Sequence, residues 1–351
     1  MKSVAMFDAK PYDREAFDRA NSGRYALHYF EAKLSVGTLP LVEGCEAICV
    51  FVNDEVDRPV LEGLAARGVR VVALRCAGYN QVDFKAAYEL GITVVRVPAY
   101  SPYAVAEHAL ALLMTLNRHL HKAAARTREF NFSLVGLTGM DLHGKTAGVV
   151  GTGKIGRVFC AICQGLGMHV LAFDAFPDAK LAGVTYVPLE TLLAEADVVS
   201  LHCPLTPQTH HLMGAKAFAG MKPGALLINT SRGALVDSTA LIESLREGRL
   251  GGAGLDVYEE ESDWFFEDRS AVVRQDKALA LLVSMPNVVV TSHQAFLTRE
   301  ALANIAETTL ANLDDVFAGR PLVNEICYRC QGQAQAAGMD CPGRKQGRCL
   351  G

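Results

Sequence analysis

Residues 145–174 read K-T-A-G-V-V-G-T-G-K-I-G-R-V-F-C-A-I-C-Q-G-L-G-M-H-V-L-A-F-D, and they are the strongest indication of the fold in the sequence. The apolar run at 146–150 predicts a strand buried on both faces, and it leads directly into G-T-G-K-I-G. Apolar residues at helical spacing then predict a helix that begins inside the glycine motif and stops at Gly165 and Gly167. A second apolar run, at 169–173, predicts the next strand.

The glycine motif has the spacing of a dinucleotide-binding turn. Gly151 permits a tight turn, Gly153 lets a pyrophosphate approach the backbone, and Gly156 lets helix and strand pack closely. Free N–H groups at the helix N-terminus attract the anion. Asp174 ends the second strand, where a carboxylate accepts hydrogen bonds from a ribose and repels a 2′-phosphate. We therefore predict a Rossmann domain that binds NAD in preference to NADP.

The composition excludes several classes of protein. The net charge of −4, with no basic stretch before the last ten residues, argues against a nucleic-acid partner. No apolar run approaches the ~20 residues of a membrane span, and the apolar start at 4–7 is too short for a signal peptide. We therefore expect a cytoplasmic protein without a membrane partner. In that reducing compartment we expect free thiols at the cysteines within apolar patterns, which are Cys45, Cys49, Cys76, Cys160, Cys163 and Cys203.

Short apolar segments alternate with helical or turn material along the chain, which predicts parallel sheets covered by helices. In the first hundred residues the predicted strands are 3–8, 47–51, 69–74 and 93–97. After Asp174 they are 184–187, 198–201, 225–229, 251–257 and 288–291. The helix predicted at 103–119 is apolar on nearly all sides, as expected between domains or at a subunit interface.

A chain of 351 residues is long for one domain, so we expect two. The helix predicted at 298–317 follows the nucleotide domain, and we expect it to return to the first domain. The prediction is therefore an α/β protein with two doubly wound parallel-sheet domains. Residues 1–99 and 296–325 form a flavodoxin-like substrate domain, residues 100–295 form the Rossmann NAD-binding domain, and residues 326–351 form a cysteine-rich tail.

Three polar residues stand beyond the ends of three successive predicted strands: Arg232, Glu261 and His293. Because parallel strands share one carboxyl edge, we expect these side chains to converge on one cleft. A protonated His293 can donate a proton to a carbonyl oxygen as hydride reaches the carbon, and Glu261 would hold the imidazole and stabilise its charge. Arg232 would bind a carboxylate or polarise the carbonyl.

Each of these residues also has a structural alternative. Arg232 alone fits a surface ion-pair partner, and His293 alone fits a satisfied histidine at a strand end. Glu261 belongs to an acidic run with Glu259, Glu260 and Asp263, and the residues alone do not single out the working carboxylate. The three positions together, beside a dinucleotide fold, favour catalysis.

Seven motifs carry a family resemblance. They are L-R-C-A-G-Y-N-Q-V-D (74–83), Y-S-P-Y-A-V-A-E-H (100–108), G-T-G-K-I-G (151–156), H-C-P-L-T (202–206), N-T-S-R-G (229–233), G-L-D-V-Y-E-x-E-S-D-x-F-F-E-D (254–268) and H-Q-A-F-L-T (293–298). Through them the chain resembles the D-isomer-specific 2-hydroxyacid dehydrogenase family, and specifically its fermentative D-lactate dehydrogenase branch, over about residues 1–325.

The resemblance implies NAD-dependent reduction of pyruvate to D-lactate, with NADH oxidised. It places the family's catalytic residues on Arg232, Glu261 and His293. The implied cofactor contacts are Gly151, Gly153, Lys154, Ile155, Gly156, Asp174, Cys203, Pro204, Thr209, Thr230, Ser231, Arg232 and Asp256. The implied substrate contacts are backbone N–H groups at Ala77 and Gly78, the pocket residues Tyr100 and Phe296 with Phe51 close by, and Arg232.

The resemblance leaves the 2-keto acid open, because related members reduce hydroxypyruvate, glyoxylate or bulkier acids such as phenylpyruvate. Formate-oxidising members of the family have no glutamate at this position, so the presence of Glu261 argues against formate as the substrate. An NAD-sensing regulatory protein is the alternative outside enzymes, and the sequence shows no extra apolar patch that would favour it. The apolar helix after Tyr103 predicts a homo-oligomer, either a dimer or a tetramer.

The C-terminal tail departs from the family. Cys327, Cys330, Cys341 and Cys349 follow a C-x2-C pattern that could hold zinc or an iron–sulfur cluster. The alternative is a flexible tail with exposed thiols, because the stretch is rich in Gly and Gln. No metal is expected in the active site.

Overall fold

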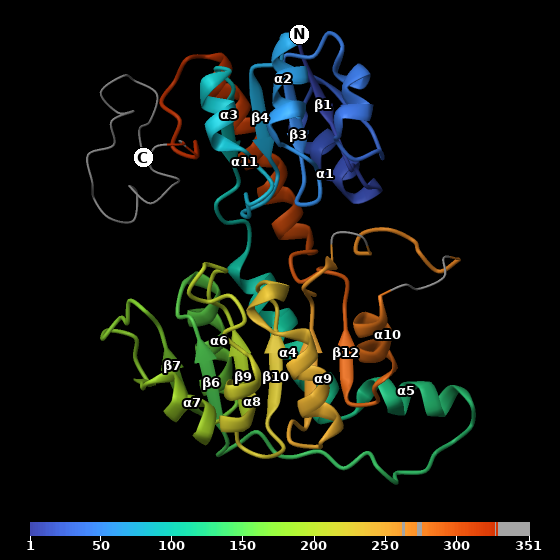
Figure 1. Cartoon of the computed structure of the whole chain (residues 1–351), viewed down its shortest axis with the longest axis vertical. Coiled ribbons are helices and arrows are strands. Elements are labelled where there is room, and N and C mark those ends of the chain that lie inside the picture. The colour runs from blue at the N-terminus through green and yellow to red at the C-terminus, as the bar shows by residue number, and fades with distance from the viewer. Residues whose placement is uncertain (262–263, 272–275, 327, 329–351) are drawn as a thin grey trace. The chain divides into compact units, whose positions relative to one another are not determined.

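The computed structural model describes residues 1–261, 264–271, 276–326 and 328 (Figure 1). The described part of the chain forms two compact units, one of Met1–Ser101 with the described residues after Phe296, the other of Pro102–Phe296. The four tail cysteines predicted as a metal site lie outside the described residues. Within the described part of the chain, no helix has the length and apolar character needed to cross a membrane.

The first unit is built on a five-stranded parallel sheet. Its strand order is β2 (Tyr25–Tyr29), β1 (Lys2–Met6), β3 (Ala47–Val50), β4 (Val71–Leu74) and β5 (Thr93–Arg96). The order 2-1-3-4-5 is that of flavodoxin-like folds. β3 and β4 are buried along their whole length, as their runs of Ala, Ile, Val and Leu require.

Four α-helices and one 3-10 helix flank this sheet. They are α1 (Pro11–Asn21), η1 (Val36–Val42), α2 (Arg58–Ala66), α3 (Phe84–Glu89) and α11 (Arg299–Phe317). Three of these helices, α2, α3 and α11, have a side-chain N-cap. The capping residues Asp57, Asp83 and Thr298 each accept a hydrogen bond from a backbone N–H in the first turn. α11 comes from the far end of the chain and packs against α1, β4 and β5.

The second unit is built on a seven-stranded parallel sheet. Its order is β12 (Val288–Val290), β11 (Gly252–Leu255), β10 (Leu226–Asn229), β9 (Val198–Leu201), β6 (Thr146–Val150), β7 (His169–Phe173) and β8 (Val184–Tyr186). Read from β8 to β11, this is the Rossmann order 3-2-1-4-5-6, with β12 added at the edge. The order reverses between β6 and β9, which is where such sheets bind their ligands.

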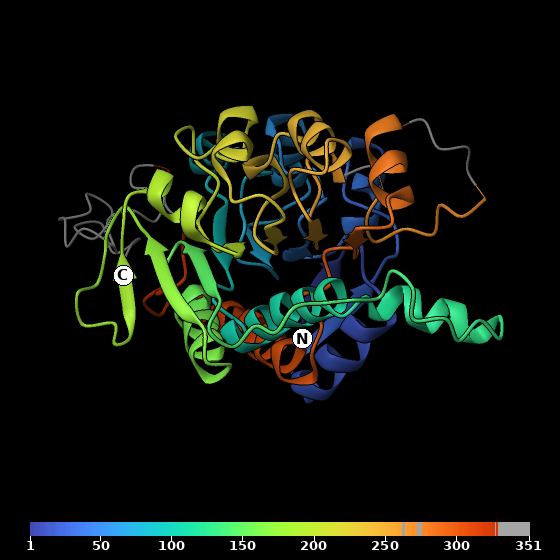
Figure 2. The same ribbon diagram turned by 90° about the horizontal axis from the view of Figure 1, so that it is seen from below.

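Helices cover both faces of the seven-stranded sheet (Figure 2). They are α4 (Pro102–Asn117), α5 (Leu120–Arg128), α6 (Lys154–Gly165), α7 (Leu189–Glu195), α8 (Ala215–Gly220), η2 (Gly233–Leu235), α9 (Ser238–Arg246) and α10 (Lys277–Ser284). One core lies under α4 and α6, and another includes residues of α7, α8, α9 and α10. Much of the apolar surface of α4 is buried within its own unit, through Ala109, Leu112 and Leu113.

The predicted fold class is confirmed, since both sheets are parallel and each is covered by helices. Strand β2 and helix α5 are absent from the prediction and present in the structure. The six cysteines expected as free thiols are free and buried: Cys45, Cys49, Cys76, Cys160, Cys163 and Cys203.

Candidate active site

The glycine loop between β6 and α6 has the shape its sequence predicts. Gly151 has φ +95°, and a Cβ there would lie 2.6 Å from the backbone nitrogen of Cys203. A Cβ at Gly156 would collide with the carbonyl oxygen of Gly151. By contrast, a Cβ at Gly153 would meet nothing within 4 Å. Two glycines are therefore required by the protein's own packing, and the third leaves open space at the loop.

The start of α6 fits an anionic ligand. Gly153 is the N-cap residue, and no described side chain caps the helix there. The first N–H groups of a helix lack partners inside it, and together they carry a partial positive charge. Lys154 and Ile155 begin the helix at this position. This arrangement suits the pyrophosphate of a dinucleotide.

Asp174 follows β7 and is bound to the glycine loop. Its Oδ2 accepts hydrogen bonds from the backbone N–H of Thr152 at 2.6 Å and from its hydroxyl at 2.9 Å, and its Oδ1 accepts from Phe176 N–H at 2.8 Å. Burial disfavours the ionised carboxylate, but hydrogen bonds from Phe176 and Thr152 outweigh it and lower the pKa of Asp174. The loop therefore carries a fixed negative charge where a ribose-binding acid is predicted.

Predicted cofactor residues in the loops after β9 and β10 bond to one another. The Ser231 hydroxyl donates to the carbonyl of Cys203 at 2.7 Å, which joins the two loops, and the Thr209 hydroxyl donates to the carbonyl of Pro204 at 2.7 Å within the loop after β9. The hydroxyl of Thr230 is buried and has no hydrogen-bond partner among the described residues. An unpaired buried hydroxyl costs free energy unless a ligand or water satisfies it, so Thr230 also fits a cofactor contact.

Glu261 and His293 form a hydrogen-bonded pair in the second unit. Glu261 Oε1 lies 2.7 Å from His293 Nδ1, and Glu261 Oε2 accepts the Tyr258 N–H at 3.0 Å. An ionised carboxylate only accepts hydrogen bonds, so Nδ1 is the donor and Nε2 is left for another partner. Within the acidic run, Glu261 is therefore the carboxylate that contacts His293, whereas Glu259 bonds to His211 and Ser238.

Asp256 positions His293 through the backbone. Its carbonyl accepts the His293 N–H at 2.7 Å, and its buried carboxylate accepts N–H groups of Gln294 at 2.9 Å and Ala295 at 2.8 Å. These bonds hold the turn in which His293 has φ 53°, a left-handed conformation uncommon outside glycine. The sequence predicts only a cofactor contact for Asp256. The structure shows in addition that Asp256 holds the turn that contains His293.

Two further residues, missed by sequence reasoning, hold Asp256. Thr291 Oγ1 donates to Asp256 Oδ1 at 2.5 Å, and His108 Nε2 lies 3.0 Å from Thr291 Oγ1 and 3.3 Å from Asp256 Oδ1. Burial disfavours the charge of Asp256, but the hydrogen bonds from His108, Thr291 and Ala295 outweigh it and lower its pKa. The available signal was the position of His108 at the end of the motif 100–108.

Arg232 lies in the loop after β10, and its guanidinium Nη1 donates to the Ser231 carbonyl at 2.7 Å. The next residue, Gly233, packs so closely on the backbone of Tyr258 that a Cβ would collide with it. This loop thus contacts the segment that leads to Glu261. Across the described residues, no hydrogen bond or ion pair joins Arg232 to Glu261 or His293.

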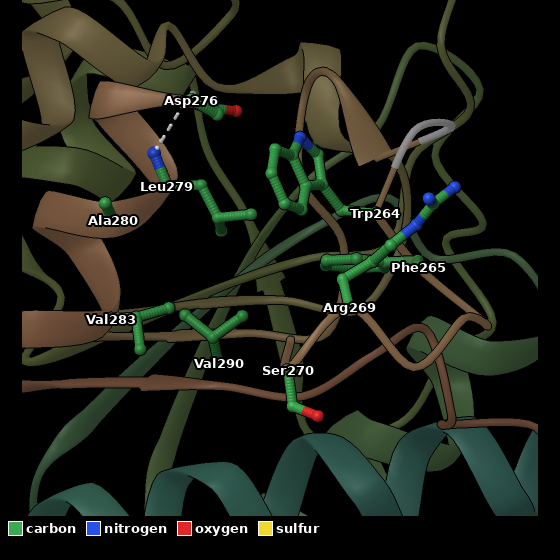
Figure 3. A pocket seen from close by; sticks show the side chains of 9 residues that line it. All are labelled: Trp264, Phe265, Arg269, Ser270, Asp276, Leu279, Ala280, Val283 and Val290. Carbon is green, nitrogen blue, oxygen red and sulfur yellow. Dashed lines mark hydrogen bonds between the residues drawn. The ribbon is translucent and has the colours of Figure 1, made fainter. Parts of the chain in front are cut away.

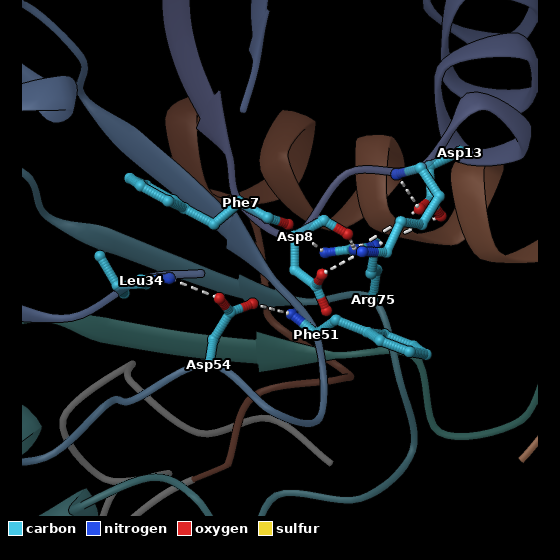
Figure 4. A network of polar contacts seen from close by, with 8 residues as sticks. Phe7, Asp8, Asp13, Leu34, Phe51, Asp54 and Arg75 are labelled. Atoms are coloured by element: carbon cyan, nitrogen blue, oxygen red, sulfur yellow. Dashed lines mark hydrogen bonds and ion pairs between the residues drawn. The ribbon is translucent and has the colours of Figure 1, made fainter. Parts of the chain in front are cut away.

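Arg75 lies at the start of the loop of the first unit that carries Ala77 and Gly78. Its side chain is 1% exposed, and its guanidinium donates to the carbonyls of Phe7 at 2.9 Å and Asp8 at 2.7 Å (Figure 4). It also pairs with the carboxylate of Asp13, Nε to Oδ1 at 3.4 Å. A buried cation needs such partners, and here they fasten the end of β4 to the segment after β1. Sequence reasoning missed this role.

The same loop is held at Ala77, whose carbonyl accepts a hydrogen bond from Arg96 Nη1 at 2.8 Å. The nearby Asp54 accepts N–H groups of Leu34 at 2.7 Å and Phe51 at 2.6 Å. Burial raises the pKa of Asp54 to about 6, against the opposing charge of Arg75. The loop that carries two predicted substrate contacts is therefore fixed by polar groups of its own unit.

The two remaining predicted substrate residues lie in different units. The carbonyl of Tyr100, in the first unit, accepts a hydrogen bond from the Asn304 side chain at 2.7 Å. Phe296, in the second unit, is 6% exposed. Their contact with a substrate remains a prediction.

A separate cavity of about 300 Å³ lies in the second unit near α10 (Figure 3). Its lining residues are Trp264, Phe265, Arg269, Ser270, Asp276, Leu279, Ala280, Val283 and Val290. Asp276 is held by Leu279 N–H at 2.9 Å and by the Tyr258 hydroxyl at 3.1 Å. None of the predicted site residues belongs to this described lining, so the cavity is distinct from the candidate active site.

Known proteins resemble the chain over nearly all of its length. A family model described as "D-isomer specific 2-hydroxyacid dehydrogenase, NAD binding domain" matches residues 110–295. The D-lactate dehydrogenase of Escherichia coli (strain K12) is 52% identical over 326 residues, which are 92% of this chain and 99% of that protein. The matched family segment holds the glycine loop, Asp174 and the Glu261–His293 pair.

Solved structures agree with the sequence match. The apo-structure of D-lactate dehydrogenase from Escherichia coli has a TM-score of 0.85 and 50% identity, covering 92% of this chain and 99% of that chain. The pyruvate reductase of Chlamydomonas reinhardtii has a TM-score of 0.88 and 42% identity, covering 92% of this chain and 98% of that chain.

Proposed function

Because the chain belongs to the D-isomer specific 2-hydroxyacid dehydrogenase family, whose members are NAD-dependent oxidoreductases, we propose that it reduces pyruvate to D-lactate with NADH. The observation that carries the proposal is the hydrogen-bonded pair of Glu261 and His293 in an NAD-binding unit. The likeness to the D-lactate dehydrogenase of Escherichia coli supports pyruvate as the substrate.

His293 is the proton donor in this proposal. NADH supplies the hydride when it is bound. His293 Nε2 gives its proton to the carbonyl oxygen, since Nδ1 is already bonded to Glu261. Glu261 stabilises the positive imidazole ring and fixes its orientation. The Tyr258 N–H keeps the carboxylate in place during this transfer.

Arg232 binds the substrate by its fork of N–H donors, which matches a carboxylate or a polarised carbonyl. The N–H groups of Ala77 and Gly78 take the substrate carboxylate. Arg75 and Arg96 hold the backbone of this loop, which supports its use as a rigid anion-binding turn. Tyr100 and Phe296 favour a small substrate side chain.

The glycine loop and the neighbouring strand ends bind NAD in this proposal. Lys154 and Ile155 offer N–H groups to the pyrophosphate, and Asp174 accepts hydrogen bonds from the ribose. The open space at Gly153, the charge of Asp174 and the buried hydroxyl of Thr230 support these assignments. We assign NAD binding to the second unit, Pro102–Phe296, and substrate binding to the first unit. The unit boundaries lie within two residues of those predicted at 99/100 and 295/296.

We also propose that the protein works in the cytoplasm as a homo-oligomer, without nucleic-acid or membrane partners. The net charge of −4 supports the absence of a nucleic-acid partner. The apolar face of α4 is largely buried in its own unit, so self-association would use the part of the helix left exposed, which includes Tyr103. Light scattering of the purified chain tests the oligomer, which a mass of one chain would contradict.

The substrate assignment is tested by NADH consumption with pyruvate, hydroxypyruvate, glyoxylate and phenylpyruvate, and with NADPH in parallel. We expect the highest kcat/KM for pyruvate with NADH. A higher value for another keto acid would replace the substrate while keeping the Arg232, Glu261 and His293 mechanism. No reaction with any of them would favour an NAD-sensing role instead.

A further inference from the structure

The second unit carries a cluster of metal-ligating side chains apart from the Glu261–His293 pair. His210 and His211 lie in the loop between β9 and α8, and Glu259 lies in the loop after β11. One ligand atom from each residue lies within 4.8 Å of the other two. We propose that these three residues bind one divalent transition-metal ion, and that zinc is the ion that fits them best.

The donor atoms suit zinc in kind and in spacing. Zinc takes imidazole nitrogen and carboxylate oxygen at about 2.0–2.2 Å, which places neighbouring donors about 3.3 Å apart in a tetrahedral site. The two imidazole rings are stacked with centroids 4.0 Å apart, and His211 Nε2 lies 2.5 Å from Glu259 Oε1. Small side-chain rotations therefore bring all three donors onto one ion, and water completes its coordination.

The backbone of the histidine loop is held independently of the imidazoles. His210 N–H donates to the Thr206 carbonyl at 2.9 Å, and His211 N–H donates to the Ala234 carbonyl at 2.9 Å. His211 has φ 51°, so these bonds hold a conformation uncommon outside glycine. The fully buried Met213 anchors the chain just after it. A site on a fixed loop loses little entropy when the ion binds.

The carboxylate of Glu259 is also fixed from outside the cluster. Its Oε2 accepts the hydroxyl of Ser238 at 2.9 Å, which leaves Oε1 facing His211. Hydrogen bonds of this kind orient metal-binding carboxylates and strengthen their hold on the ion. The side chains of His211 and Glu259 are 35% and 26% exposed, so an ion can reach them from solvent.

The proposed site joins two loops with predicted functions. The histidines directly follow Thr209, a predicted cofactor contact, and Glu259 lies two residues before Glu261. An ion bound here would clamp the loop after β9 to the loop after β11. Imidazoles bind a metal ion only in their unprotonated form, so the affinity of the site for zinc should fall on acidification.

The test is zinc titration by calorimetry of the full chain with serine in place of Cys327, Cys330, Cys341 and Cys349, so that no tail thiol competes. We expect one zinc ion per chain. His210→Ala in the same background should weaken binding at least about tenfold, because even the loss of a supporting group costs a metal site about 10- to 100-fold. His169→Ala, which removes an exposed histidine at the start of β7, should leave it unchanged.

Thermal unfolding gives a second readout. Zinc that binds only the folded chain raises its melting temperature, and the rise should be absent with His210→Ala. The proposal is overturned if the parent binds no zinc, or if His210→Ala binds it as tightly as the parent. It is also overturned if Mg²⁺ binds as tightly as zinc, since that marks a hard-cation site instead.

Discussion

Glu261 Oε1 and His293 Nδ1 lie 2.7 Å apart, and the other oxygen of Glu261 is held by the Tyr258 N–H at 3.0 Å. The carboxylate is thus fixed by its own loop before it meets the imidazole. The imidazole is also held in place, because Asp256 accepts the backbone N–H groups of His293, Gln294 and Ala295. This double support leaves His293 Nε2 as the ring nitrogen available to a substrate.

Replacing His293 with Gln should lower kcat for pyruvate reduction by about 10²- to 10⁴-fold, the usual contribution of a positioned proton donor. NADH binding should stay nearly intact, because the imidazole is assigned to the substrate and not to the dinucleotide. Stopped-flow rates and a fluorescence titration with NADH measure the two effects. Normal turnover in this variant would remove His293 from the mechanism.

Replacing Glu261 with Gln should lower kcat for pyruvate reduction. The neutral amide removes the negative charge that faces the imidazole across the 2.7 Å hydrogen bond. Glu260→Gln is the matched control, since Glu260 is an exposed neighbour in the same acidic run. Steady-state kcat for pyruvate reduction is the measurement, and equal values for both variants would contradict the pairing.

Alanine at Gly153 and alanine at Gly156 should fail in different ways. Gly156→Ala should destabilise the second unit, because its Cβ would collide with the carbonyl oxygen of Gly151. Gly153→Ala should fold normally but bind NADH at least about tenfold more weakly, because its methyl group enters the open space proposed for the pyrophosphate. Thermal unfolding and NADH titration separate the two, and full NADH affinity in Gly153→Ala would place the dinucleotide elsewhere.

Replacing Asp174 with Ala should raise the relative use of NADPH about tenfold or more, because the charge that repels a 2′-phosphate is removed. Asp178→Ala is the control, since that carboxylate is paired with Arg157 at 2.8 Å and is not assigned to the ribose. The ratio of kcat/KM for NADH and NADPH measures the change. The same ratio in both variants would show that the ribose is recognised by other groups.

His202 should make the folded chain sensitive to acid. Burial lowers the pKa of His202 from 6.5 to about 3, so between these values the unfolded chain binds the proton and the folded chain does not. The free energy of unfolding should therefore fall as the pH drops through this window. His202→Phe keeps a ring against Phe159, 5.0 Å away in the parent, and should lose less stability between about pH 7 and about pH 4.5. Equal losses in urea unfolding would contradict this.

The sequence predicted those parts of the fold whose residues repeat a simple pattern. Buried strands such as β6 and β9 are continuous apolar runs, and the glycines of the cofactor loop have fixed spacing. Strand β2 was missed because it lies at the sheet edge and only Tyr25 is buried. Helix α5 was missed because none of its residues is buried, so it has no apolar stripe to detect.

The candidate site was predictable where residues follow strand ends, and not where distant segments meet. Arg232, Glu261 and His293 follow successive strands. Asp256 and Thr291 also come directly after β11 and β12, but His108 reaches them from α4, and only the structure shows that contact. The residues alone did not distinguish Glu261 from Glu259 as the working carboxylate. The geometry does, because Glu261 contacts His293 and Glu259 contacts His211.

Chiral chromatography of the lactate formed from pyruvate, while the purified chain consumes NADH, tests the proposed reaction. We expect D-lactate in amounts equal to the NADH oxidised. L-lactate, or NADH oxidation without lactate, would contradict the assignment as a D-lactate dehydrogenase.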